Sequence, residues 1–192
     1  YRIIVLLCSP KAVCPQTSSN SCSTVSFSGI SMAYNLAGWR FFKCSTCSTA
    51  YPTYKWGDRL DSGESLLKTA WKEAISDWER VQSKVDFSYN SESNSVLNSW
   101  YESGSSILGR MTTYRTLNYV SEFIGELNAG HPKITETNYA RSTANHELGH
   151  AMGLDHTSNG SIMDSNRDRS VVYTPQKDDI NGINAVYIIL LR

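Results

Sequence analysis

The chain has 192 residues and a mass of 21.5 kDa, a size that suits one globular domain with room for a small appendage. Basic and acidic residues both number 18, so the formal net charge is +0 and no global field attracts nucleic acid or an anionic membrane. Hydrophobic residues make up 40% and charged residues 19%, which indicates a folded chain. The longest apolar runs, Ile3 to Leu7 and Ile188 to Leu191, are too short to span a bilayer.

The first 32 residues differ in composition from the rest of the chain. They are rich in cysteine, serine and threonine and show no sustained hydrophobic period. We therefore expect an irregular extension over residues 1–32 and one globular domain over residues 33–192. The opening basic residue and short apolar stretch weakly resemble the remnant of a secretory signal, although the stretch is shorter than such signals need.

The ordered part begins with a predicted strand from Gly38 to Phe42. The pattern Asp61-x-x-Glu64 is a capping box and predicts the start of an amphipathic helix. Apolar residues then recur every three or four positions, so that one face of this helix would be buried. They are Leu67, Ala70, Trp71, Ala74, Ile75, Trp78 and Val81.

Three further strands are predicted in the middle of the chain. Residues 85–89 alternate between apolar and polar, as a half-buried strand does. A loop rich in serine and asparagine is expected from there through Asn98. Ile107 to Tyr114 and Phe123 to Leu127 are the next strand candidates.

Two helices are predicted after these strands. The first runs from Ala140 to Met152 and ends at Gly153, because glycine readily adopts the backbone conformation that stops a helix. The second begins with Thr174 as N-cap and Pro175 at the first helical position, and residues 178–179 add two acids near the positive end of its dipole. Helices that come after a run of strands predict an α+β fold with one sheet.

The stretch from His146 to His156 carries the pattern HExxHxxGxxH. His146 and His150 are four positions apart on a predicted helix, so their imidazoles project from the same face and can bind one metal ion. Gly153 lets the chain leave the helix and bring His156 back to the same ion. Three imidazoles favour zinc, although cobalt or copper would accept such ligands in vitro. A set of three leaves a fourth coordination position open, as a catalytic site requires.

Glu147 directly follows the first predicted ligand and is expected beside the metal. Zinc lowers the pKa of bound water from about 15.7 to roughly 7, and a neighbouring carboxylate can take the proton as that water attacks a carbonyl. We therefore expect Glu147 to act as general base and then as proton donor to the leaving amine, with zinc stabilising the oxyanion. Ordinary core and surface histidines are the simpler explanation, but the pattern uses three of the four histidines in the chain.

The signature resembles that of the metzincin zinc endopeptidases, in which a Met-turn follows HExxHxxGxxH. Residues 161–163, Ser-Ile-Met, come at a fitting distance, and the resemblance places Met163 in an apolar floor under the metal. Within the metzincins the chain is most similar to the matrixins, over about residues 33–187. Three further segments carry this similarity: Tyr34 to Trp39, Ala70 to Trp78 and Gln176 to Tyr187.

The resemblance implies a twisted mixed sheet with an antiparallel edge strand, beside which an extended peptide lies in a cleft above the zinc. Phe123 to Leu127 is our candidate for that edge strand, and residues 164–174 are our candidate for the wall of the specificity pocket. Asp178 and Asp179 match family acids that brace the site from beneath, or they serve only as helix N-terminal charges. We expect a secreted monomer with protein or peptide substrates that binds no nucleic acid and no membrane.

The chain departs from the family in the loops for additional metal ions and at the residue after Met163. One catalytic zinc is expected, and calcium is left open. The loops that hold a structural zinc and calcium in vertebrate matrixins have no clear counterpart between Val96 and Thr137, so no motif supports calcium. His131 is interpreted as a solvated loop residue. Asp164 stands where many matrixins carry another residue, which bears on the shape of the pocket.

The cysteines leave three interpretations open. Cys44-Ser-Thr-Cys47 resembles half of a zinc ribbon, but the chain has no second CxxC. An odd cysteine suits the pro-segment thiolate that blocks the zinc of latent matrixins, although the family's flanking pattern is absent. Disulfides that staple an extracellular N-terminal extension would leave one thiol over. The five positions are Cys8, Cys14, Cys22, Cys44 and Cys47.

The sequence therefore predicts a zinc-dependent metalloendopeptidase. One alternative is a catalytically silent metzincin-fold binding module, whose mark would be a lost base, whereas Glu147 is present. The other is a zinc amidohydrolase that acts on a non-protein amide by the same chemistry. A long open groove beside an edge strand would favour the peptidase, and a closed pocket would favour the amidohydrolase.

Overall fold

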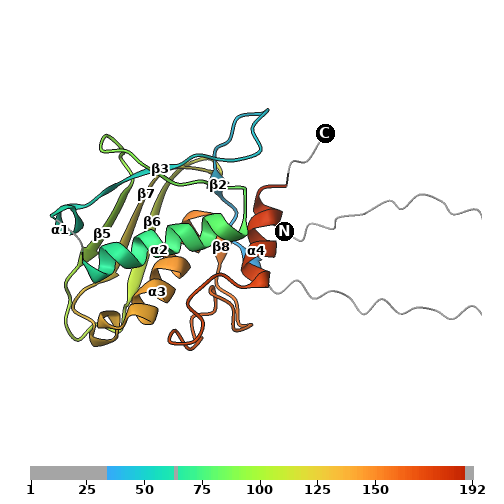
Figure 1. Cartoon of the computed structure of the whole chain (residues 1–192). Coiled ribbons are helices and arrows are strands. Elements are labelled where there is room, and N and C mark those ends of the chain that lie inside the picture. The colour runs from blue at the N-terminus through green and yellow to red at the C-terminus, as the bar shows by residue number, and fades with distance from the viewer. Residues whose placement is uncertain (1–33, 63–64, 189–192) are drawn as a thin grey trace, which may run out of the picture. The chain divides into compact units, whose positions relative to one another are not determined.

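The computed structural model describes residues 34–62 and 65–188 (Figure 1). The predicted division of the chain at residue 32 falls outside these residues and stays a prediction, and so do the interpretations of Cys8, Cys14 and Cys22. No helix within the described ranges combines the length and the apolar character that crossing a membrane requires.

The main sheet in the described part of the chain is mixed and has six strands. Its parallel strands lie in the order β2-β7-β5-β3-β4, and β6 pairs antiparallel with β7. The strands are β2 (Arg40–Phe41), β3 (Thr53–Trp56), β4 (Ser88–Tyr89), β5 (Val96–Trp100), β6 (Gly109–Thr116) and β7 (Tyr119–Asn128). A separate two-stranded ladder joins β1 (Asn35–Leu36) to β8 (Leu154–Asp155).

The prediction that Phe123 to Leu127 forms the edge strand is wrong. These residues belong to β7, which pairs with β6 on one side and with β5 and β2 on the other. Phe123 and Leu127 are almost completely buried. Their apolar pattern is therefore that of an inner strand and not of an edge strand. β6 is the antiparallel edge strand, and its sequence GRMTTYRT is polar because most of its side chains face solvent.

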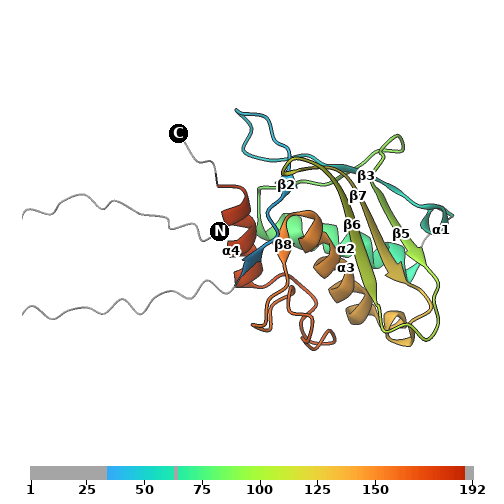
Figure 2. The ribbon, with the colours of Figure 1, turned by 180° about the vertical axis from the view of Figure 1, so that it is seen from behind.

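Two long helices cover one face of the sheet and pack against each other (Figures 1 and 2). They are α2 (Leu66–Val81) and α3 (Thr137–Ala151). The shorter helices are α1 (Asp58–Asp61), the 3-10 turn η1 (Pro132–Thr135) and α4 (Lys177–Val186), and α4 lies beside β8 at one end of the domain. The predicted α+β class is thus confirmed, with mostly parallel strands and one antiparallel edge.

Two predicted helix starts were misplaced. α2 begins at Leu66, where the Ser65 side chain accepts a hydrogen bond from the backbone of Lys68, and Asp61 instead ends α1. Glu64 lies outside the described residues. α4 begins at Lys177 rather than after Thr174, because Asp179 accepts the N–H of Gln176, at 2.7 Å, and so makes Gln176 the N-cap.

The predicted burial of two tryptophans on α2 is confirmed. Trp71 and Trp78 are both completely buried, whereas Val81 at the end of the helix is 36% exposed. Each indole also donates a hydrogen bond out of the helix, Trp71 to the carbonyl of Asn98 on β5 and Trp78 to that of Asn145 on α3, both at 3.1 Å. α2 therefore ties the helix that carries the histidines to the sheet.

Several strands are shorter than predicted or were not anticipated. β2 occupies two residues of the predicted stretch from Gly38 to Phe42, and within residues 85–89 only Ser88–Tyr89 form a strand. β1, β3 and β8 had no predicted counterpart. The expected serine- and asparagine-rich loop contains β5, which pairs with β3 and β7 and is a central strand despite its polar residues.

Cys44 and Cys47 are joined by a disulfide in the loop between β2 and β3. The interpretation of this pair as half of a zinc ribbon is therefore wrong, because oxidised sulfurs do not ligate zinc. The disulfide also lies in the globular domain and not in the extension where we expected such bridges.

Candidate metal centre

The candidate centre is built where α3 ends. His146 and His150 project from one face of α3, since four residues complete little more than one helical turn. Gly153, with φ of +103°, ends the helix in the left-handed region. A Cβ at this position would also collide with the carbonyl oxygen of Trp39, so only glycine fits here. β8 then pairs with β1 and brings His156 back toward the helix.

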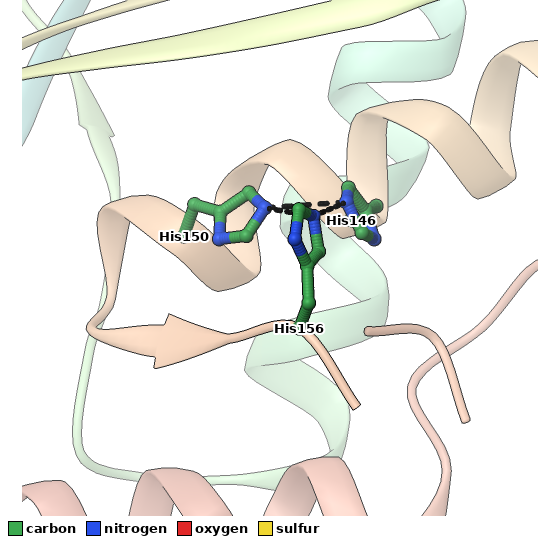
Figure 3. A group of neighbouring side chains, drawn as sticks. All are labelled: His146, His150 and His156. Atoms are coloured by element: carbon green, nitrogen blue, oxygen red, sulfur yellow. Dashed lines mark hydrogen bonds between the residues drawn. The ribbon is translucent and has the colours of Figure 1, made fainter. Parts of the chain in front are cut away.

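The three predicted ligands converge on one point (Figure 3). The Nε2 atoms of His146 and His156 are 3.2 Å apart, those of His146 and His150 3.2 Å, and those of His150 and His156 3.1 Å. An ion at the usual Zn–N distance of about 2.05 Å from all three atoms would have N–Zn–N angles near 100°, which suits a four-coordinate site with one open position. The residues present therefore fit a zinc ion.

Backbone carbonyls hold two of the rings in the orientation that this geometry needs. Nδ1 of His146 lies 2.8 Å from the carbonyl oxygen of Ile162, and Nδ1 of His150 lies 3.0 Å from that of Leu154. When Nδ1 carries the hydrogen and donates it, Nε2 keeps its lone pair for a metal. Burial lowers the pKa of His146 well below its ordinary value and also lowers that of His150, so both rings are neutral near pH 7.

Glu147 is buried beside these rings, with only 6% of the residue exposed. Its carboxyl group lies against the start of the edge strand: a Cβ on Gly109 would come within 2.9 Å of Oε1. Burial raises the pKa of Glu147 to about 8, and the charges of Arg167 and Arg169 act in the opposite direction. A bound dication would act in the same direction as these arginines and favour the carboxylate.

A family comparison covers this region of the chain. The model of the matrixin family matches residues 86–188, more than half of the sequence. The chain belongs to the matrixin family. The match includes all three histidines, Glu147 and α4, and it starts after α2. No curated protein matches the chain.

Membership confirms the resemblance predicted from the signature and places the chain in a class of zinc metalloproteases. The fold, with its antiparallel edge strand and its helices on one face, is that of a matrixin catalytic domain. Four of the five signature positions converge as expected: the three histidines at one point, and Glu147 beside them.

The predicted Met-turn packs against the helix that carries two of the histidines. Met163 is buried, and a Cβ on Gly149 of α3 would collide with its sulfur, so the side chain packs directly against the helix. Asp179 accepts the backbone N–H groups of Ile162, at 2.9 Å, and of Met163, at 3.2 Å. Of the two predicted bracing acids, Asp179 thus holds the Met-turn, whereas Asp178 accepts a hydrogen bond from the side chain of Asn159, at 3.1 Å.

Sequence reasoning missed Arg167, a buried arginine behind the first ligand. Its guanidinium donates to Oγ and the carbonyl oxygen of Ser142, at 3.0 and 2.8 Å, and to the carbonyl oxygen of Asp164, at 2.8 Å. It also lies 3.2 Å from Nδ1 of His146. Burial lowers the pKa of Arg167 to about 9. The surrounding sequence SNRDRS is typical of a solvated turn and gives no local signal for this burial.

Two other predicted positions behave differently from expectation. His131 is half-buried and not simply solvated: its Nδ1 accepts the backbone N–H of Lys133, at 3.2 Å, and caps η1. Asp164 does not offer its carboxylate to a pocket. It accepts the backbone N–H groups of Asn166 and Gly160, both at 2.9 Å, and these bonds lower its pKa.

Proposed function

We propose that this matrixin is a zinc-dependent metalloendopeptidase that hydrolyses peptide bonds in protein or peptide substrates. The observation that carries the proposal is the convergence of three imidazole nitrogens with a buried carboxylate beside them. Membership in a metalloprotease family supports the same class of reaction. His146, His150 and His156 are the proposed ligands, and Met163 supports them from below.

Zinc supplies, when bound, a Lewis acid that polarises a carbonyl group and acidifies water. The histidines donate neutral nitrogens to it, and the carbonyls of Ile162 and Leu154 keep their rings from rotating away. Because the three ligands come from protein and one position stays open, substrate and water have access to the metal.

Glu147 is the proposed general base. Burial raises the pKa of its carboxyl group and a bound dication would lower it, and these opposing effects suit a group that both accepts and returns a proton. It would take a proton from the attacking water and give it to the nitrogen of the leaving amine. Its burial excludes bulk water from that exchange.

The free edge of β6 favours the hypothesis of a peptide substrate over that of a small amide. β6 pairs with β7 on one side, and among the described strands none pairs with its other side. An extended peptide can add to such an edge through main-chain hydrogen bonds. β6 begins at Gly109, directly beside Glu147, so a peptide added there would pass the proposed base. The alternative is a catalytically silent binding module. A measurement of peptidase activity distinguishes between the two.

We further propose that the protein works outside the cell as a monomer and binds neither nucleic acid nor membrane. The disulfide between Cys44 and Cys47 supports an oxidising compartment, in which such bridges persist. The balanced charge of the chain supports the absence of nucleic-acid binding.

The proposal is tested by incubating the full chain, loaded with zinc, with a mixed peptide library and identifying cleavage products by mass spectrometry. We expect internal peptide bonds to be cleaved, a chelator to abolish cleavage and added zinc to restore it. Cleavage that survives complete removal of metal would contradict the proposed chemistry. Cleavage of small non-peptide amides alone would favour the amidohydrolase.

Replacing the base separates metal binding from catalysis. We expect Glu147→Ala to bind one zinc ion per chain and to lose about 10²- to 10⁴-fold in kcat, the usual contribution of a general base. Glu136→Ala, which removes an exposed carboxylate at the start of the same helix, is the matched control and should retain activity. Full activity in Glu147→Ala would refute the assigned role.

A further inference from the structure

Three residues of α3 form one stripe along the helix at four-residue intervals. Tyr139, Thr143 and Glu147 make up this stripe, which we call the Glu147 stripe. The edge strand borders it on one side: a Cβ on Gly109 would come within 2.7 Å of Cγ2 of Thr143 and 2.9 Å of Oε1 of Glu147. A peptide added to β6 would therefore lie close to this stripe.

The loop of residues 164–173 borders the same helix on the next face. Asn138 donates its side-chain N–H to the carbonyl oxygen of Ser170, at 3.0 Å, and the Ser142 hydroxyl donates to that of Val172, at 2.6 Å. Positions 138 and 142 immediately precede 139 and 143 in the chain, so the loop lies along the flank of the Glu147 stripe. The stripe thus has β6 along one side and this loop along the other.

The loop of residues 164–173 brings two arginines to the site. Neither Arg167 nor Arg169 takes part in an ion pair within the described ranges. Arg167 donates three hydrogen bonds, to the hydroxyl and carbonyl oxygens of Ser142 and to the carbonyl oxygen of Asp164. Both arginines interact electrostatically with Glu147.

Arg169 differs from Arg167 because its guanidinium makes fewer hydrogen bonds. Nη1 donates to the carbonyl oxygen of Ser165, at 3.2 Å, and Nε is buried without any hydrogen-bond partner in the described part of the chain. Arg169 interacts electrostatically with the carboxylates of Glu147 and Asp164. A buried, unpaired donor on a cation is costly, and a functional role is one of the explanations for such a donor in a native protein.

The neighbouring carboxylates are already committed to other donors. Asp164 accepts two backbone N–H groups, and Asp168 accepts the backbone N–H and the hydroxyl of Ser170, at 2.9 and 2.6 Å. Glu147 must stay free to exchange a proton in the proposed reaction. Within the described ranges, no neighbouring carboxylate is therefore left over to pair with Arg169.

We infer that Arg169 binds a carboxylate of the substrate, so that the enzyme prefers peptides with Asp or Glu at one position flanking the scissile bond. This inference rests on the proposed function. A guanidinium and a carboxylate form paired, charge-assisted hydrogen bonds, which a neutral side chain of the same shape cannot match. The peptide position is the one whose side chain extends from β6 across the Glu147 stripe toward the loop.

The test uses the zinc-loaded full chain and a peptide library in which each of the three positions on either side of the scissile bond is varied. At one of these positions, we expect Glu to exceed its neutral isostere Gln about ten-fold in kcat/KM, as one charge-assisted hydrogen bond provides. Arg169→Gln should lower the kcat/KM of the Glu peptide relative to that of the Gln peptide about ten-fold. Arg169→Glu should move the preference toward Lys.

Arg115→Gln is the matched control, because Arg115 lies over the Trp39 ring, 4.2 Å from its centroid, and should leave the Glu-to-Gln ratio unchanged. Cleavage without an acidic preference at any position would overturn the inference and leave the proposed peptidase intact. An equal loss for all peptides in Arg169→Gln would also overturn it. An absence of all cleavage would refute both proposals. The wild-type ratio decides the question even if the variant fails to fold.

Discussion

At Gly109 the edge strand passes closest to the carboxylate of Glu147. The β-carbon of any other residue would lie within 2.7 Å of Cγ2 of Thr143 and 2.9 Å of Oε1 of Glu147. Thr143 cannot turn freely, since its hydroxyl donates to the carbonyl oxygen of Tyr139, at 2.8 Å. The carboxylate is the more flexible of the two neighbours, and it would be the group that moves.

We therefore expect Gly109→Ala to lower kcat ten-fold to hundred-fold, because a displacement of about 1 Å misaligns the base. Zinc affinity, measured by competition with a chelator, should not change. The added substitution Thr143→Ser removes the crowding methyl group and should restore part of the activity. Thr112→Ala, on the other face of the same strand, controls for the change in strand propensity. Unchanged kcat in Gly109→Ala would show that the carboxylate is not positioned this way.

At the scale of single residues, the sequence predicts site residues that local helix geometry brings together. It does not predict contacts between residues that are far apart in the chain. The three histidines and Glu147 could be identified because helix periodicity and one glycine determine where their side chains point. Arg167 could not, since it contacts Ser142 and His146 across 25 and 21 positions of the chain. Nothing in its own neighbourhood distinguishes it from an arginine in solvent.

Between the helices, one buried carboxylate joins α2 to α3. Asp77, whose side chain is 1% exposed, accepts two hydrogen bonds from Arg141, at 2.8 and 2.6 Å, and one from Asn145, at 2.9 Å. Asn145 is the residue before the first proposed ligand. Arg80 also approaches Asp77, at 3.4 Å, but its side chain is 65% exposed.

The two arginines provide a matched test of this clamp. Arg141→Met should lower the free energy of unfolding by roughly 2–4 kcal/mol, because it leaves a buried charge without its main partner. Arg80→Met should cost no more than about 0.5 kcal/mol, as solvent screens exposed pairs. Urea unfolding of the zinc-loaded protein measures both. Equal losses in the two variants would contradict the role of the clamp.

The elements themselves were predicted with uneven success. α2 and α3 were recognised because their apolar periodicity extends over several turns. The edge strand was confused with its neighbour, since alternation reports burial and Phe123 is more deeply buried than any residue of β6. β5 was missed because its polar residues pair in the centre of the sheet, where backbone hydrogen bonds and not side chains determine its place.

For the whole domain, the helices pack on the sheet through apolar side chains. The buried side chains of α2, α3 and β7 form one continuous core, and carbonyls of the chain itself hold two histidine rings. The α+β class could be predicted from the element order, whereas the second, two-stranded sheet of β1 and β8 could not. The pairing order of the strands could not, because parallel neighbours lie far apart in the sequence.

Removal of zinc should therefore leave the fold intact but less stable. At a free zinc concentration a hundred times the dissociation constant, binding adds about 2.7 kcal/mol. For a domain of this size, this corresponds to roughly 5–10 °C in Tm. Circular dichroism at rising temperature, with and without a chelator, measures the shift, and His150→Ala should not show it. Loss of helical signal on chelation at 25 °C would contradict this expectation.

The hydrogen bonds between Asp179 and the Met-turn make α4 part of the structural support of the metal centre. The carboxylate of Asp179 accepts the N–H of Ile162, and the carbonyl oxygen of Ile162 lies 2.8 Å from Nδ1 of His146. The last helix is therefore connected to the first metal ligand through the backbone of a single residue. An engineer who grafted only the HExxHxxGxxH segment onto another scaffold would transfer the ligands without this support. The smallest portable version of the site includes α4.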